Sequence, residues 1–379
     1  MTARFSKAFL AGACTMAVVL IYVTDLRANP SPSVTSKERE VDLLNRVERT
    51  VDAHVVPVFA KLSQTTKDLT HAVEYHCDAQ DIGSLKTTES AFRQTVLAWA
   101  AAEHLRFGPL RDEGRASHIH FWPDPRGVTR RQMRKVFHEH DAKRLEPDVL
   151  QDQSVAVLGL GAVEYFLLHE AKRFANGPVE KAEDYECLYI RGVARLVEKE
   201  ADTIHAEWTK PDGWRTRILN PAPNHKVFRN ADESVAQLVK SLVLGLQLVR
   251  SQKIVPLYEL AMGKAKRAKV PFQRLGLADD YVEASLLSLK QLNDALSLTD
   301  FARGRTEWVK QWTAQGFGAL ERLAKSLEVP PKKRLSADDF EISQLRQMRF
   351  YTNGLRQVIA RQTAPSAGLT IGFNELDGD

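Results

Sequence analysis

The chain has 379 residues, of which 44% are hydrophobic and 27% are charged, and its formal net charge is +5. This composition is typical of a globular protein with material for one large or two ordinary domains, and it does not favour a disordered chain. Basic residues alternate with acidic ones along the predicted helices, so no nucleic-acid partner is expected. The densest basic stretch, residues 264–274, is interpreted as a solvated helix end.

Residues 1–28 are predicted to form a signal peptide. Arg4 and Lys7 precede an apolar run over residues 8–23, and Ala28 supplies a small residue at the cleavage point. The sequence therefore predicts an exported, periplasmic protein.

Two alternatives concern the same leader. It could be retained as a membrane anchor on the periplasmic face, which would be the only membrane contact of the protein, or it could be lipidated at Cys14. Residues 29–36 are rich in Pro and Ser and are interpreted as a tether.

Beyond the tether, apolar residues recur every three or four positions, which predicts helices and no sheet. A kink is expected at Pro57. The predicted helices cover about residues 37–77, 85–106, 129–140, 154–170, 178–208, 232–249, 279–297, 301–327 and 337–361.

A cluster of Asn and Pro over residues 220–224 marks a boundary between two halves. The predicted fold is all-α, with one antiparallel helical bundle over residues 37–219 and a second over residues 225–379. The tail from Gly368 is expected to pack back onto the second bundle.

The predicted helix from Ser154 to Glu170 places Glu164 inside an almost wholly apolar run. A carboxylate removed from water must be paired or hydrogen-bonded, or it shifts its pKa and stays neutral. Glu164 is therefore either a structural acid that bridges to an arginine or part of a functional site. Glu170 and His169 are expected at the more solvated end of this helix.

Gly159 and Gly161 are expected to leave a gap beside this acid. Each glycine costs roughly 1 kcal/mol relative to Ala inside a helix, so its presence indicates close helix packing or room for a ligand. Tyr165 follows Glu164 and could offer a hydroxyl to the same site.

The stretch from Phe107 to Gly127 is too long and too rich in Gly, Pro and aromatic residues for an ordinary helix connection. Its Trp122 is costly to expose, so the loop is expected to pack onto the bundle and to carry Asp124 with it. Arg106, just before the loop, is the expected counter-charge for Glu164 or Asp124.

His118 and His120 would point to one side of an extended segment, which is a spacing able to hold a metal ion. His104, at the end of the preceding helix, is a third candidate ligand. The alternative is that these histidines are ordinary polar groups of a loop.

Cys77 and Cys187 remain once the leader is removed, and an exported protein would meet an oxidising compartment. We expect a disulfide between them; the alternative is two separate buried thiols.

Three stretches, taken together, resemble the imelysin family and in particular its predicted periplasmic lipoprotein branch. They are EHLRFGP at residues 103–109, FWPD at residues 121–124 and GLGAVEY at residues 159–165. The third corresponds to the GxHxxE motif of the family, except that Gly161 stands where the family has histidine. The resemblance implies two pseudo-symmetric helical bundles with a site in the cleft between them, and it implies metallopeptidase activity or a link to iron uptake.

The functional hypothesis is a non-catalytic, exported binding or accessory protein in which residues 106–124 close over Glu164. Its ligand could be iron, another divalent metal or a peptide, and envelope proteins are possible partners. A second hypothesis is a metallopeptidase with a degenerate motif, in which His104, His118 or His120 replaces the missing histidine. In a third, Glu164 is a core ion pair and the protein acts through its surface.

Overall fold

A computed structural model describes residues 36–175, 185–264, 269–327 and 339–371. The predicted signal peptide and nearly all of the predicted tether lie outside these residues. Within them the chain forms helices and no strand, which confirms the all-α prediction. No helix in these segments is long and apolar enough to cross a membrane.

The longer helices are α1 (Ser36–Thr50), α2 (Val56–Ala79), α3 (Ile82–Ala102), α5 (Val128–Glu139), α7 (Gly159–Ala175), α8 (Tyr185–Thr209), α10 (Ala231–Leu248), α12 (Ala278–Leu296), α13 (Trp308–Lys325) and α14 (Asp339–Val358). Short helices connect them: α4 (Arg115–Ile119), α6 (Pro147–Gln151), α9 (Trp214–Leu219), α11 (Val255–Ala261) and α15 (Ala364–Ser366).

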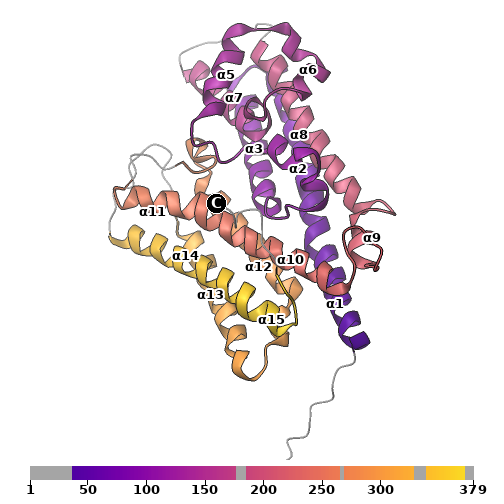
Figure 1. Cartoon of the computed structure of the whole chain (residues 1–379). Helices are drawn as coiled ribbons and strands as arrows, with labels where there is room; N and C mark the ends of the chain where they lie inside the picture. Colours follow the sequence, from indigo (N-terminus) through magenta and orange to yellow (C-terminus); the bar gives the residue numbers. More distant parts are fainter. Residues whose placement is uncertain (1–35, 176–184, 265–268, 328–338, 372–379) are drawn as a thin grey trace, which may run out of the picture.

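Two layers of helices are visible in Figure 1. In the first, α2 packs against α3 and α8, and α7 packs against α8. In the second, α10 packs against α14, and α13 packs against α12 and α14. Contact between α3 and α12 joins the layers. Ser288 of α12 donates a hydrogen bond to the carbonyl of Ala101, so the carboxyl end of α3 lies at the junction.

Helix α1 packs with the second layer although it directly precedes α2 of the first layer in the sequence. It contacts α10 and α12, and its Leu43 and Val47 are fully buried. Arg39 forms an ion pair with Asp232 at 2.5 Å. The predicted first bundle, residues 37–219, therefore starts inside the second one, and α1 and α2 run on as one rod through both.

In the described segments, three π-helical stretches interrupt the α-helices: η1 (Val51–Val55), η6 (Val249–Ile254) and η10 (Ile359–Thr363). Each ends two residues before a proline, namely Pro57, Pro256 and Pro365. Proline lacks an N–H group and its ring clashes with the carbonyl four residues earlier. The wider π turn accommodates this clash within a continuing helix, where the sequence predicts only a kink at Pro57.

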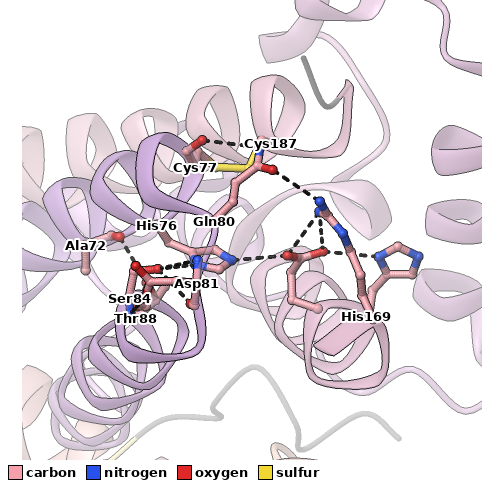
Figure 2. A network of polar contacts seen from close by, with 11 residues as sticks. Ala72, His76, Cys77, Gln80, Asp81, Ser84, Thr88, His169 and Cys187 are labelled. Atoms are coloured by element: carbon pink, nitrogen blue, oxygen red, sulfur yellow. Dashed lines mark hydrogen bonds and ion pairs between the residues drawn. A yellow bond between two sulfur atoms is a disulfide. The ribbon is translucent and has the colours of Figure 1, made fainter. Parts of the chain in front are cut away.

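A polar network fastens α7 to α2 in the first layer (Figure 2). Fully buried Glu170 contacts His76 Nε2 at 3.2 Å and accepts hydrogen bonds from Arg173 at 3.3 Å. His76 Nδ1 continues the network to Ser84 Oγ at 2.9 Å. The expectation that Glu170 lies at a solvated helix end is wrong, because the helix continues to Ala175 and turns this residue toward α2.

Beside this network, Cys77 of α2 and Cys187 of α8 form a disulfide, with their Cα atoms 5.5 Å apart. Gln80 connects the two features. It receives a hydrogen bond from Arg173 at 3.2 Å and donates one to the carbonyl of Cys77 at 3.4 Å. The disulfide and the ionic network thus hold the same end of the first layer.

Candidate functional site

Helix α7 begins at Gly159, five residues later than predicted. Gly159 has φ +67°, and a Cβ at this position would lie 2.5 Å from the carbonyl oxygens of His118 and Ile119. The sequence predicts a glycine in the interior of a helix, but Gly159 is the first residue of α7. It is the point where the loop after α3 touches the start of α7, and this close approach is possible only without a side chain.

Glu164 lies one turn further along α7 and is partly buried. Its Oε1 atom is shielded from solvent and has no hydrogen-bond partner in the described part of the chain. Burial raises the pKa of Glu164 to about 7, and the positive charge of Arg274 opposes this shift. At neutral pH the carboxyl group is thus poised between a proton donor and a charged acceptor.

Gly161, three residues before this acid, lies against Thr129 of α5. A Cβ here would meet Thr129 Cγ2 at 3.4 Å, which is ordinary van der Waals contact. The ring of Tyr165 packs edge-on against Phe137 of α5, with centroids 5.4 Å apart. Tyr165 is thus part of the packing between α5 and α7.

Residues of the loop after α3 take several separate roles. Asp124 Oδ1 and Oδ2 accept hydrogen bonds from the backbone N–H groups of Val128 and Thr129, at 2.7 and 3.0 Å, and so hold the start of α5. Arg106 Nε donates to the carbonyl of Glu103 at 3.2 Å. The positive charge that lowers the pKa of Glu164 belongs to Arg274, whereas the sequence predicts Arg106 as the counter-charge.

The two candidate histidines of the loop face different surroundings. His118 lies in α4 and its Nδ1 contacts Glu200 Oε1 at 2.9 Å. His120 is buried and stacks on Phe272 with centroids 4.6 Å apart. The expectation that both point to one side of an extended segment is wrong, because the chain is helical up to Ile119. The Trp122 ring also stacks on His120, at 6.0 Å.

A second set of buried polar groups lies where the layers meet, and we call it the junction network. Lys253 of η6 forms an ion pair with Glu103, which directly follows α3. Lys253 Nζ also donates to Ser285 Oγ at 2.5 Å, and Tyr281 Oη donates to Glu103 Oε2 at 2.6 Å. Lys253 and Glu103 are only 1% and 6% exposed, so this charge pair is removed from water.

Two buried histidines extend the junction network. His54 of η1 and His104 have ring centroids 5.9 Å apart, and His54 Nε2 contacts Ser288 Oγ at 3.4 Å. His104 Nε2 is buried without a partner among the described residues. Burial lowers the pKa of His54 to about 4 and that of His104 well below its usual value, so both are neutral at pH 7.

One loop of the second half connects Glu164 with the junction network. Phe272 packs between His120 and Tyr281, at 4.6 and 5.1 Å between centroids. Arg274, two residues later, is the cation that acts on Glu164. Burial, together with the charges of Lys253 and Arg106, lowers the pKa of His120 to about 3. The loop thus lies against both α7 and the junction network.

Lys253, His54 and Glu103 are not among the site residues predicted from the sequence. A signal for them is present, because His54 and Lys253 each stand three residues before a proline, in HVVP and KIVP. Both are placed by the π turn that precedes that proline. Such turns often occur at functional sites. The pattern shared by HVVP and KIVP covers only four residues, and the sequences that flank it differ between the two places.

The residues of this site do not fit a metal ion held by the His-plus-Glu pair that the family motif implies. Gly161 replaces the histidine, and His118 and His120 are engaged elsewhere. Within the described segments no group of three His, Cys, Asp or Glu side chains is arranged to hold a metal ion. The site instead offers one titrating carboxyl group, neutral imidazoles and a buried charge pair.

Residues 55–297 match the family model described as Imelysin, also labelled Peptidase M75. No curated protein sequence matches the chain. Among the solved structures, the following two share its fold.

An imelysin-like protein from Psychrobacter arcticum 273-4 has a TM-score of 0.69 and 19% identity, with 89% of this chain and 98% of that one covered. A "putative iron-regulated protein A precursor" from Parabacteroides distasonis ATCC 8503 has a TM-score of 0.64 and 12% identity, with 84% of this chain and 93% of that one covered.

Proposed function

Because this chain belongs to the imelysin family, we propose that it is an exported, non-catalytic binding or accessory protein linked to the uptake of iron or another metal. The observation that carries the proposal is the shielded Oε1 atom of Glu164, which has no hydrogen-bond partner among the described residues and lies three residues after Gly161, where the chain has no side chain. A group that titrates near pH 7 and lacks a partner can gain one from a ligand. The iron-regulated name of one structural neighbour supports the metal link.

The surroundings favour binding over hydrolysis. A hydrolase needs an activated nucleophile and a base within hydrogen-bond reach of it. Lys253, Glu103 and Tyr281 already satisfy one another, and His54 and His104 are neutral imidazoles without a hydroxyl or thiol nucleophile between them. Ser288 touches His54, but its hydroxyl donates to the carbonyl of Ala101 at 2.8 Å.

One carboxylate cannot hold a metal ion alone. The cargo in this proposal therefore keeps ligands of its own, and Glu164 and Arg274 recognise the complex. Export to the periplasm follows from the predicted leader and is part of the proposal. A retained leader would place the same site on the periplasmic face of the membrane.

The experiment is a calorimetric titration of the chain from Asn29, purified without a histidine tag. The titrants are Fe²⁺, Zn²⁺ and ferric citrate, which brings its own oxygen ligands. We expect Glu164→Gln to weaken binding roughly tenfold or more, since hydrogen bonds to charged groups are worth about 1.5–3 kcal/mol. Glu40→Gln, at an exposed position on α1, is the matched control and should bind as the parent does.

Two outcomes would overturn the proposal. The first is the absence of binding of any titrant, or binding that Glu164→Gln leaves unchanged. The second is cleavage of a denatured protein that both a chelator and Glu164→Gln abolish, because this result would establish the metallopeptidase alternative.

A further inference from the structure

Three arginines gather in the second layer, away from the junction network. Arg250 lies in η6, and Arg349 and Arg356 lie in α14, which packs against η6, α10 and α11. Arg349 and Arg356 are seven residues apart. Seven residues are two turns of an α-helix, so both occupy one face of α14.

None of these side chains has an acidic partner within the described segments. The Nε atoms of Arg250 and Arg349 are shielded from solvent and find no acceptor there. The acids at the start of α10 are engaged elsewhere, because Asp232 pairs with Arg39 and Glu233 pairs with Arg229. On α11, exposed Glu259 forms no ion pair with the three arginines.

The cluster is held in place by packing. The guanidinium of Arg349 lies over the ring of Tyr258, 4.2 Å from its centroid. Burial, followed by the charges of Arg349 and Arg356, lowers the pKa of Arg250. Guanidinium groups remain protonated at any ordinary pH, so their repulsion persists in the folded protein unless an anion offsets it.

We propose that Arg250, Arg349 and Arg356 form a binding site for a phosphate-type oxyanion. The planar guanidinium fork matches the spacing of phosphate oxygens and can donate two parallel hydrogen bonds. The anion could be the phosphoryl group of a soluble molecule or of a lipid headgroup. Lys253, three residues beyond Arg250, is committed to Glu103. The arginine cluster shares no residue with the function proposed for Glu164 and Arg274, so the two can be tested separately.

The test measures thermal unfolding and calorimetric binding of the chain from Asn29 with inorganic phosphate, against sodium chloride at equal ionic strength. We expect phosphate to raise Tm beyond the chloride control. Arg250→Gln and Arg349→Gln should each weaken phosphate binding roughly tenfold or more. Arg361→Gln is the matched control, because Arg361 is exposed in the segment that continues α14.

A second readout separates a binding site from a structural role. In chloride alone, Arg250→Gln should raise Tm, because it removes a partly buried charge that two like charges repel. The same variant should lose the stabilisation by phosphate. A lower Tm in both salts, with phosphate affinity unchanged, would overturn the proposal, as would equal stabilisation of the parent by phosphate and chloride.

Vesicles distinguish the two sources of the anion. Cosedimentation with phosphatidylglycerol but not phosphatidylcholine, lost in Arg349→Gln, would identify a lipid headgroup. Phosphate binding without vesicle binding would identify a soluble ligand. If neither phosphate nor vesicles respond to the arginine variants, the site does not exist.

Discussion

Two glutamates six residues apart on α7 have opposite electrostatic surroundings. Burial raises the pKa of Glu164 to about 7, with only the charge of Arg274 in opposition. Burial would also raise the pKa of Glu170, but hydrogen bonds from His169 and His76 and the charge of Arg173 hold it at about 2. Because the folded-state pKa values lie on opposite sides of the usual value, substitution should affect stability with opposite signs.

For Glu164, the folded state prefers the protonated acid. The parent should therefore lose stability as pH rises from about 4.5 to above 7, by up to about 3 kcal/mol at 1.36 kcal/mol per pKa unit. Glu164→Gln lacks this charge, so it should match the parent at pH 4.5 and be more stable at pH 8. Urea unfolding at both pH values checks this. A variant that is less stable at pH 8 would show that the ionised carboxylate has a partner in the fold.

For Glu170, the folded state prefers the ionised acid. Its contribution is complete above about pH 4.5 and is lost as pH falls toward 2. Glu170→Gln should lower the free energy of unfolding at pH 7 by roughly 3–5 kcal/mol, because it leaves Arg173 and His76 without their buried partner. The deficit should shrink at pH 2.5 in the same urea assay. A deficit that is constant with pH would point to lost packing instead.

At this scale, the sequence could predict the burial of Glu164, because apolar residues surround it in one run. It could not predict that Glu170 is buried. Arg173 is its neighbour on α7, but His76 lies on α2, 94 residues away in the sequence. Glu103 and Lys253 are 150 residues apart, and only the folded structure brings them together. Long-range ionic partners leave no local pattern, whereas a buried acid in an apolar helix does.

Among the elements, α7 contains two glycines with different structural roles. Gly159→Ala should destabilise the protein by about 2 kcal/mol or more, because its Cβ would press on the carbonyls of His118 and Ile119 and its φ is positive. Gly161→Ala is the matched control, since only Thr129 lies in ordinary contact. It should be neutral or stabilise by up to about 1 kcal/mol. Equal losses in thermal unfolding would contradict this distinction.

The existence of most long helices could be predicted from their periodicity, but their ends could not. Helix α3 starts at Ile82, three residues before the predicted start at Leu85. Asp81 caps this start by accepting a hydrogen bond from the N–H of Ser84 at 2.8 Å. The π-helical segments could not be predicted either, for a different reason. Their side chains look helical in the sequence, and only the proline that follows marks the change in hydrogen bonding.

At the scale of the whole molecule, the buried pair Lys253–Glu103 links the two layers. Lys253→Met alone should cost roughly 3–5 kcal/mol, because it leaves Glu103 buried and unpaired. The double variant with Glu103→Gln should cost much less than the sum of the single variants. Urea unfolding of the full cycle measures this coupling.

The exposed pair Lys290–Asp294 provides the control cycle, with a coupling of about 0.3–0.5 kcal/mol expected. A junction coupling no larger than this value would show that the buried pair holds the layers together no better than a surface pair does. The all-α architecture itself could be predicted. The sharing of α1 between the layers could not, because periodicity does not reveal which partner a helix face meets.

This shared rod has a consequence for dissecting the protein. A fragment that starts at the Pro-rich boundary near residue 225 lacks α1, and the faces of α10 and α12 that α1 covers would be open to solvent. A fragment that stops there carries α1 without α10 and α12, and leaves it only its contacts with α9 and the start of the rod. The second layer is therefore completed by a segment far from it in the sequence, and complementation between separately expressed pieces would require residues 36–55 to be expressed with the carboxyl-terminal half.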